Sequence, residues 1–416
     1  MKRLLLSASA IILVVAASAT LRDDIAASPG KSGGIYYAYP VTEDVSPDPP
    51  SGYTPVYISH YGRHGSRWLI KEWEYTLMLE ALAEQRKKGN LTPVGIDVES
   101  KVKALWNDAD GNYGALTQLG ERQHRAIADR LSARYPSLFA DSATINVYSS
   151  TEPRCIVSMA AFCERLKEKN SALRIKRKVS PGNMDFIAYS TPEAKAWGAD
   201  TASWRKDYYH WRDSIVNPRR VMSLIFNDPS KVDNHHFFIR MLHDIAVGEQ
   251  NVAVKTGLID IFTDDELYTL WQELNYNMYV KHACATISRN AGPESASSLL
   301  RHFIDEADRQ LSSDKRGVTL RFGHDTNLIR LLALMKIDGC AIAECDPDRY
   351  CLAWQDFNVS PMGANLQLIF FRDNEGKTIT LIRHNERPVT VPLKPVKGTK
   401  YFYDWDELRA FWSDLK

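Results

Sequence analysis

The sequence predicts an α/β protein, in which a mixed, mainly parallel sheet flanked by helices carries a mostly helical inserted domain. The first observation behind this prediction is a repeated order of strand, polar loop and helix, which occurs at three places along the chain. The second is the stretch 180–311, where Trp, Tyr, Leu and charged residues recur at helical spacing. The third is a hairpin pattern near the C-terminus, which adds antiparallel strands.

The first unit starts at Pro55–Tyr61, a run of β-branched and aromatic residues that predicts a strand and ends before Gly62. Leu and Ala recur at helical spacing over Trp73–Lys88, which predicts a helix. The loop between them reads Arg63-His64-Gly65-Ser66-Arg67. A cationic loop therefore follows directly on the first strand.

The second and third units have the same layout. Thr117–Tyr135 predicts an amphipathic helix with a threonine cap. A short strand over Ile145–Ser149 and a helix over Pro153–Leu166 come next. Gly317–Gly323 predicts the third strand, and Thr326–Lys336 predicts a strongly apolar helix.

The C-terminal part predicts antiparallel structure and a closing helix. Ala364–Phe371 and Lys377–His384 flank Asn374-Glu375-Gly376, a pattern typical of a hairpin. We expect Arg387–Leu393 to add a further strand and Asp404–Leu415 to form the last helix.

The N-terminal residues have the order of a secretory signal peptide. Met1-Lys2-Arg3 is basic, Leu4–Ala17 is apolar, and Ala17-Ser18-Ala19 offers the small residues of a cleavage site. We therefore expect 1–19 to be a signal peptide and the protein to be periplasmic or secreted. No later window of the sequence supplies the roughly twenty apolar residues of a membrane-spanning helix, so we expect no membrane partner.

Composition divides the rest of the chain. We expect 20–52 to be an N-terminal arm, because residues 26–50 are rich in Gly, Pro, Ser and Asp and predict an extended segment. We expect 53–179 and 312–416 to form the α/β core, and 180–311 to form the mainly α-helical insertion.

The overall charge favours a small-molecule partner. The 52 basic and 51 acidic residues nearly cancel, which leaves a formal net charge of +1. Because no global charge attracts nucleic acid or an anionic membrane, any anion site must arise from local clustering. Arg174–Lys178 is such a cluster, but in a predicted strand it is interpreted as a solvated sheet edge.

The cysteines predict no metal site. Cys340, Cys345 and Cys351 share a loop rich in Asp and Pro, where we expect one disulfide in an oxidising compartment. Their spacing matches no zinc motif. Eight residues apart on a predicted helix, Cys155 and Cys163 are interpreted as buried free thiols.

The histidines of the insertion receive a similar interpretation. His235, His236 and His243 lie in an apolar stretch, and no carboxylate spacing completes a ligand set there. We interpret them as core or surface histidines.

The loop after the first strand has the chemistry of a phosphate site. Arg63 and Arg67 offer planar donors that match phosphate oxygens, and Gly65 lets the backbone approach a ligand closely. Ligands of α/β sheets bind at the carboxyl ends of the strands. We therefore expect Arg154, after the second strand, and His324-Asp325, after the third, to meet this loop.

The charges of this set suggest two roles. Nearby cations disfavour the imidazolium form of His64, which leaves a neutral nitrogen for nucleophilic attack on phosphorus. Asp325 is the expected proton donor to the leaving alcohol. An aspartate beside three arginines is ionised, but the charge of bound phosphate raises its pKa. We expect better activity at acid pH and no metal or other cofactor.

Together Arg63-His64-Gly65-Ser66-Arg67, Arg154 and His324-Asp325-Thr326-Asn327 resemble the histidine acid phosphatases. This branch of the histidine phosphatase superfamily includes periplasmic phytases, glucose-1-phosphatases and multiple inositol polyphosphate phosphatases. The resemblance covers about 53 to 395. It implies a phosphohistidine intermediate, an α/β core and a helical cap formed by the insertion.

The resemblance assigns roles residue by residue. His64 resembles the family nucleophile and Asp325 the proton donor. Lys71 stands where periplasmic phytases carry a basic substrate-contacting residue. The residues that resemble the phosphate clamp are Arg63, Arg67, Arg154 and His324. The chain departs from the family at Trp68-Leu69, where a proline is usual, which leaves loop shape and substrate choice open.

We expect an exported acid phosphatase that acts on phosphate monoesters, with inositol polyphosphates such as phytate as the first choice. The alternatives are a sugar phosphate such as glucose-1-phosphate, or broad specificity. A mutase of the phosphoglycerate-handling branch is disfavoured by the export signal and by its different proton donor, a glutamate. A non-catalytic inositol phosphate binder is disfavoured by the presence of both His64 and Asp325.

Overall fold

The structure, a computed structural model, describes residues 20–40, 43–313 and 315–415. The predicted signal peptide, 1–19, lies outside the described residues. Within the described ranges, no helix combines the length and the apolar character needed to cross a membrane.

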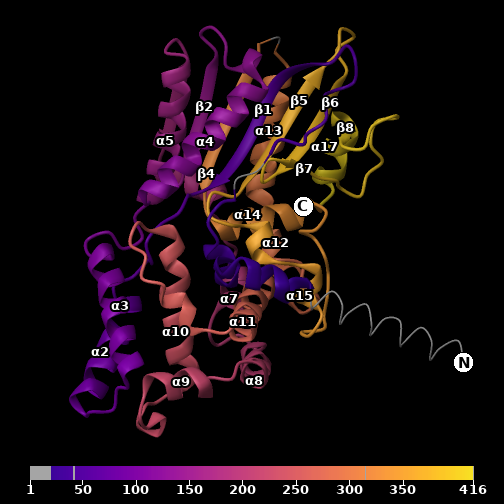
Figure 1. Ribbon diagram of the computed structural model, residues 1–416. Coiled ribbons are helices and arrows are strands. Elements are labelled where there is room, and N and C mark those ends of the chain that lie inside the picture. The colour runs from indigo at the N-terminus through magenta and orange to yellow at the C-terminus, as the bar shows by residue number, and fades with distance from the viewer. Residues whose placement is uncertain (1–19, 41–42, 314, 416) are drawn as a thin grey trace, which may run out of the picture.

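Among the described residues, eight strands form one sheet, which lies in the upper part of Figure 1. They are β1 (Thr54–Arg63), β2 (Thr144–Ser149), β3 (Arg174–Val179), β4 (Gly317–Gly323), β5 (Asn365–Arg372), β6 (Thr378–His384), β7 (Arg387–Pro388) and β8 (Phe402–Asp404). The order is β3-β2-β4-β1-β5-β6-β7, with β8 paired to β6. Strands β1 to β4 are parallel, whereas β5 and β6 form an antiparallel hairpin beside β1. This topology confirms the predicted mixed sheet.

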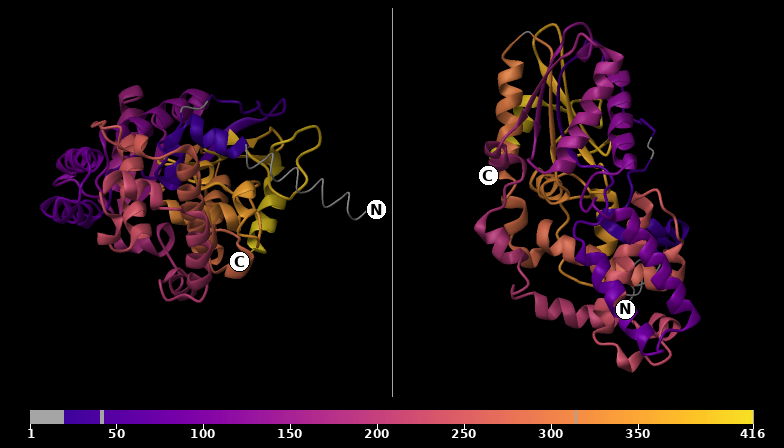
Figure 2. Two further views of the ribbon diagram at one scale, coloured as in Figure 1. Left: turned by 60° about the horizontal axis from the view of Figure 1, so that its bottom comes forward. Right: turned by 90° about the vertical axis from the view of Figure 1, so that its left-hand side faces the viewer.

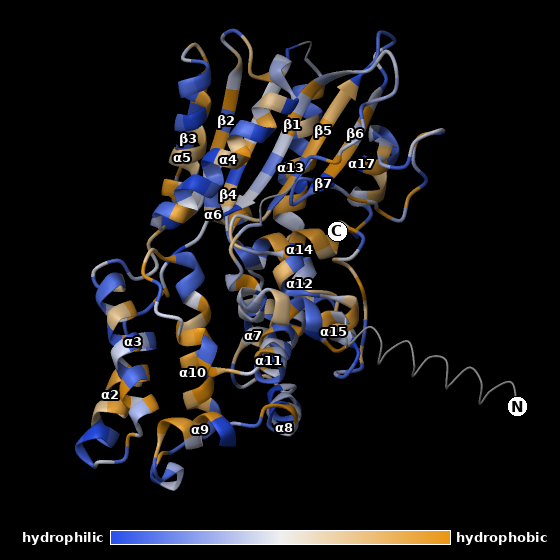
Figure 3. Ribbon diagram, viewed as in Figure 1, coloured by the Kyte–Doolittle hydropathy of each residue, from blue (hydrophilic) through white to orange (hydrophobic). Residues whose placement is uncertain are grey.

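Helices cover both faces of the sheet (Figure 2). They are α4 (Gln118–Arg134) and α5 (Pro153–Lys169) on one face, and α13 (Ser297–Leu311) and α17 (Trp405–Ser413) on the other. Successive side chains of β1 therefore enter two different cores, Ile58 with α4 and α5, and Tyr57 with α13 and α17. In Figure 3, β5 and β6 are mainly hydrophobic, as expected for strands covered on both faces.

A helical part lies beyond the carboxyl ends of the parallel strands (Figure 1). Its helices include α2 (Trp73–Lys87), α3 (Pro93–Ala109), α8 (Arg205–Ile215), α9 (Arg219–Ile225), α10 (His235–Gly248) and α11 (Asp264–His282). The α2–α3 pair precedes the predicted insertion in sequence, yet it packs against α9 and α10. Helix α3 was not among the predicted elements, although Thr92 caps it and Pro93 starts it.

The remaining helices are of two kinds. The α-helical ones are α6 (Met184–Ile187), α7 (Pro192–Gly198), α12 (Ala291–Glu294), α14 (Asp325–Leu334), α15 (Tyr350–Ala353) and α16 (Asp356–Val359). The 3-10 helices are η1 (Pro29–Tyr36), η2 (Pro136–Leu138), η3 (Pro181–Asn183), η4 (Pro229–Lys231), η5 (Glu249–Asn251), η6 (Leu258–Ile261) and η7 (Thr286–Ser288).

Most predicted elements are confirmed within a few residues. The Thr117 side chain accepts the Gly120 N–H at 3.3 Å, which caps α4 as predicted. The predicted strand over Arg387–Leu393 is only two residues long, Arg387–Pro388, because the chain then leaves the sheet. The cationic strand β3 is the exposed edge that the sequence predicts.

The predicted extended arm is wrong over Pro29–Tyr36, which forms η1. This segment packs against α10 and α11, and Ser32, Gly33 and Gly34 are buried. Ser32 Oγ lies 3.1 Å from His243 Nε2, so a polar contact ties η1 to the helical part. The stretch rich in Gly and Ser is therefore a packed element, because its small residues allow close approach to these helices.

The predicted disulfide is also wrong, because all six cysteines are free thiols. The three candidates face different surroundings. Cys340 Sγ lies 3.8 Å from His384 Nδ1, Cys351 Sγ contacts Tyr268, and Cys345 is exposed.

Candidate active site

The end of β1 fixes the first loop between two neighbouring strands. His64 N–H donates to Gly323 O at 3.0 Å, at the end of β4. His64 O accepts the Gly363 N–H at 2.9 Å, just before β5. His64 is therefore held by backbone contacts on both sides, and its side chain is 2% exposed.

Gly65 permits the close approach of α4 to this loop. A Cβ on Gly65 would lie 2.6 Å from both Cα and O of Gly120. The Gly65 N–H donates to Ser158 Oγ at 3.2 Å, which ties the loop to α5 as well. Glycine is required at this point because a side chain would collide with the backbone of α4, whereas the predicted close approach to a ligand stays a prediction.

The remainder of the loop is anchored to both parts of the molecule. Ser66 Oγ donates to Asn251 Oδ1 at 2.7 Å, and Gln123 Oε1 accepts the Ser66 N–H at 2.8 Å. The guanidinium of Arg67 lies 5.1 Å from the ring centre of Tyr36 in η1, a cation–π contact. The indole Nε1–H of Trp68, the next residue, donates to Asp108 Oδ2 at 2.8 Å.

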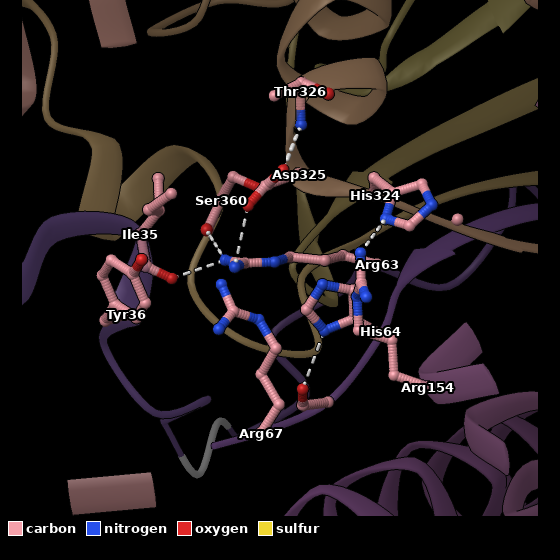
Figure 4. Close-up of polar contacts among 12 residues, drawn as sticks. Ile35, Tyr36, Arg63, His64, Arg67, Arg154, His324, Asp325, Thr326 and Ser360 are labelled. Atoms are coloured by element: carbon pink, nitrogen blue, oxygen red, sulfur yellow. Dashed lines mark hydrogen bonds and ion pairs between the residues drawn. The ribbon is translucent and has the colours of Figure 1, made fainter. Parts of the chain in front are cut away.

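The second and third units bring Arg154 and His324 to the same place (Figure 4). Arg154 Nη2 lies 3.5 Å from His324 Nδ1, and Ser150 Oγ lies 3.3 Å from His324 Nε2. The rings of His64 and His324 are 5.8 Å apart. Arg154 also donates to Glu152 Oε2 at 3.1 Å.

Asp325 is the first residue of α14 and points toward Arg63 (Figure 4). Its Oδ2 lies 2.9 Å from Arg63 Nη2, and its Oδ1 accepts the Thr326 N–H at 2.7 Å. The Arg63 side chain is fully buried, whereas the Asp325 side chain is 14% exposed. The carboxyl group is therefore the partner of this ion pair that solvent can reach.

The hydrogen bonding of His64 defines its tautomer. Nδ1 lies 2.9 Å from Gly65 O, and a carbonyl oxygen can only accept a hydrogen bond. In the neutral ring, Nδ1 therefore carries the proton and Nε2 keeps its lone pair.

The surroundings keep His64 neutral. Burial, followed by the charges of Arg63 and Arg67 and the ring of His324, lowers the pKa of His64 well below its usual value. Burial and Arg154 likewise lower the pKa of His324 to about 4. Both imidazoles are thus uncharged in mildly acid solution.

The surroundings of Asp325 favour the charged form of its carboxyl group. Burial alone would raise its pKa, but Arg63, His324, Arg67 and the Thr326 N–H outweigh burial and lower the pKa to about 2. In this ligand-free arrangement Asp325 is a carboxylate.

The structure thus brings together six of the seven candidate residues: Arg63, His64, Arg67, Arg154, His324 and Asp325. The seventh, Lys71, is exposed in the segment before α2, where its backbone N–H donates to Glu74 Oε2 at 2.6 Å. Among the described residues, no cluster of three His, Cys, Asp or Glu side chains is placed to hold a metal ion.

Sequence reasoning missed the backbone that holds Arg63. Its Nη1 donates to Ile35 O at 2.5 Å and to Ser360 O at 2.6 Å. Neither carbonyl has a sequence signature, because every residue carries one. The Tyr36 ring was missed because its segment was predicted to be an extended arm.

The family model of the histidine phosphatase superfamily (branch 2) matches residues 63–385 of this chain. No curated protein matches this chain. The solved structure of the Bifidobacterium longum multiple inositol polyphosphate phosphatase in complex with inositol hexasulfate is similar, with a TM-score of 0.75 and 17% identity. This similarity covers 93% of this chain and 98% of that chain.

Two phytase structures are also similar. The phytase from D. castellii has a TM-score of 0.68 and 14% identity, over 93% of this chain and 85% of that chain. The Klebsiella sp. ASR1 phytase has a TM-score of 0.57 and 14% identity, over 89% of this chain and 96% of that chain. At these identities the likeness establishes the fold alone.

Proposed function

Because the chain belongs to branch 2 of the histidine phosphatase superfamily and is a phosphatase, we propose that it hydrolyses phosphate monoesters through an intermediate on His64. One observation carries this proposal: an uncharged His64, with its Nε2 lone pair free, stands among three arginines. This is the arrangement that an in-line attack on a phosphoryl group needs.

The proposed reaction has two steps. In the first, the equatorial phosphate oxygens lie against Arg63, Arg67 and Arg154, and His64 Nε2 attacks phosphorus. The P–N bond forms as the ester P–O bond breaks, and the departing oxygen takes the proton of the Asp325 carboxylic acid. In the second step Asp325, now a carboxylate, takes a proton from water as that water attacks phosphorus and releases phosphate from His64.

The low pKa of Asp325 fits this proposal only if the substrate changes it. A bound phosphate dianion adds negative charge beside Asp325 and competes for the guanidinium of Arg63. Both effects raise the pKa of Asp325, so the substrate itself favours the protonated donor. This arrangement favours activity at acid pH.

For the substrate, we propose inositol polyphosphates, with phytate as the first choice. The Bifidobacterium longum structure, whose fold this chain shares, is of a multiple inositol polyphosphate phosphatase with inositol hexasulfate bound. Lys71, exposed near the Arg67 loop, offers an additional cation for a second phosphate. Sugar phosphates remain the alternative, because the clamp contacts a phosphoryl group that all these esters share.

We also propose that the protein is exported to the periplasm or the exterior. The support is the order of basic, apolar and small residues over 1–19. Sequencing the N-terminus of the protein recovered from cells tests this proposal, with a start at Thr20 as the expected result.

The test of the activity is phosphate release from phytate, glucose-1-phosphate and an aryl phosphate at mildly acid pH. If none of the three esters is cleaved, the proposed function is refuted. Acid-free quenching with a radiolabelled phosphate ester should trap phosphohistidine on the wild type but not on His64→Ala. The exposed His210→Ala is the control variant and should label like the wild type.

A further inference from the structure

Two backbone carbonyls accept hydrogen bonds from the guanidinium of Arg63 (Figure 4). Arg63 Nη1 donates to Ile35 O, in η1, and to Ser360 O, directly after α16. These carbonyls fix the direction of the planar guanidinium, and with it the position of Nη2 beside Asp325. The geometry of the candidate phosphate site therefore depends on how η1 and α16 are held together.

Asp356 joins these two segments. It is the first residue of α16, and its backbone carbonyl accepts the Ser360 N–H at 2.8 Å. Its carboxyl group lies against η1, since a Cβ on Gly34 would stand 2.1 Å from Asp356 Oδ2. Gly34 also has a φ of +55°, so this turn of η1 needs glycine both for its backbone and for the carboxyl group beside it.

Asp356 is also anchored to α11. Trp271 Nε1–H donates to Asp356 Oδ1 at 3.0 Å, and Asn275 Oδ1 accepts the Asp356 N–H at 2.8 Å. The residue is fully buried, and the backbone N–H groups that act on its carboxyl group include that of Ile35 in η1. Burial raises the pKa of Asp356 to about 7, against the opposing effects of Trp271 and nearby backbone N–H groups. The carboxyl group of Asp356 therefore contacts both α11 and η1.

We propose that Asp356 is a positioning residue for Arg63. Asp356 holds η1 and α16 against α11, so that Ile35 O and Ser360 O fix the orientation in which the Arg63 guanidinium binds phosphate. It acts through these carbonyls and not on the substrate. The inference rests on the proposed function, in which Arg63 binds the transferred phosphoryl group. It extends that function by a residue that lies outside the phosphate clamp.

The first test is inorganic phosphate binding, measured by calorimetry, together with hydrolysis of an aryl phosphate. Asp356→Ala should weaken phosphate binding and lower kcat/KM by about 10- to 100-fold, the scale of a small misplacement of a binding group. Asp356→Asn keeps the size of the side chain and an acceptor for Trp271. At mildly acid pH, where the aspartic acid is itself uncharged, Asp356→Asn should restore most of both quantities.

The second test asks whether the effect passes through Arg63. Lysine cannot donate to both carbonyls and to Asp325 in the same planar geometry. In an Arg63→Lys background, Asp356→Ala should therefore cause little further loss of phosphate affinity. Additive losses would overturn the proposal, as would an unchanged phosphate affinity in Asp356→Ala.

Controls separate positioning from general damage. Glu273, a second buried acid, belongs to α11 and has Tyr208 and Arg240 as partners, so Glu273→Gln should leave phosphate affinity unchanged. If Asp356→Ala does not fold, Gly34→Ala presses on the same carboxyl from η1 and should weaken phosphate binding similarly. Normal phosphate affinity in a folded Gly34→Ala would overturn the proposal.

Failure of the proposed function gives a different result. A wild type that binds phosphate but cleaves no ester refutes the hydrolytic function, whereas the binding comparison among these variants still decides the role of Asp356.

Discussion

Arg63 Nη2 and Asp325 Oδ2 lie 2.9 Å apart, which pairs a proposed phosphate ligand with the proposed proton donor before any phosphate binds. The ion pair keeps Asp325 ionised, because Arg63 is the strongest of the charges that lower its pKa. Phosphate must compete for the same guanidinium. In the proposed mechanism, substrate binding therefore controls when Asp325 becomes an acid.

Replacing the donor should affect substrates according to their leaving groups. Asp325→Asn keeps an acceptor for the Thr326 N–H but removes the acidic proton. We expect kcat for an alkyl phosphate such as phytate to fall by about 10²- to 10⁴-fold, the usual contribution of a general acid. An aryl phosphate with a good leaving group should be affected far less. The exposed Asp305→Asn serves as the control. Equal losses on both substrates would contradict the assigned role.

The acid limb of the pH profile should report on His64. Imidazolium cannot attack phosphorus, so kcat/KM falls as pH drops through the pKa of His64. Burial lowers this pKa most, and Arg154 adds to the lowering. Arg154→Gln should raise the pKa of His64 and move the acid limb of kcat/KM for an aryl phosphate to higher pH.

The position of the limb is the measurement here, since the loss of Arg154 also weakens phosphate binding. Arg165→Gln removes a cation from the same helix, where it pairs with Asp129 instead. This control should leave the limb in place. A limb that stays fixed in Arg154→Gln would argue against His64 as the group that titrates.

The close approach of Gly65 and Gly120 should make the loop intolerant of side chains. Gly65→Ala places a Cβ 2.6 Å from the Gly120 backbone, so the loop or α4 must move. We expect a loss of about 1–3 kcal/mol in the free energy of unfolding and a large drop in kcat. Thermal unfolding and aryl phosphate hydrolysis measure these effects. Gly198→Ala, which would meet nothing within 4 Å, should change neither.

Lys71 should matter only for substrates with more than one phosphate. Lys71→Gln should lower kcat/KM for phytate by about 2- to 5-fold, the scale of one exposed charge interaction, and should spare an aryl phosphate. Raising the ionic strength should reduce the difference. The control is Lys87→Gln, an exposed cation at the other end of α2. An equal effect on both substrates would show that Lys71 does not select for polyphosphates.

Local sequence patterns predicted most strands and helices of the α/β core, although helix α3 and strand β8 were not among the predicted elements. The alternation of β-branched residues in β1, the threonine cap of α4 and the turn before β6 are decided by neighbours along the chain. The candidate site followed from the same information, because His64 and Asp325 stand directly after strands whose carboxyl ends share an edge. Parallel pairing then brings them together.

Only the tertiary structure decided how that site is held. The carbonyls of Ile35 and Ser360 reach Arg63 from positions 28 and 297 residues away, and no side-chain pattern announces a backbone acceptor. The three free thiols Cys340, Cys345 and Cys351 make the same point, since nearness in sequence did not give them a common environment. Composition alone predicted an extended arm where η1 is packed, because burial of a Gly-rich segment depends on the helices that cover it.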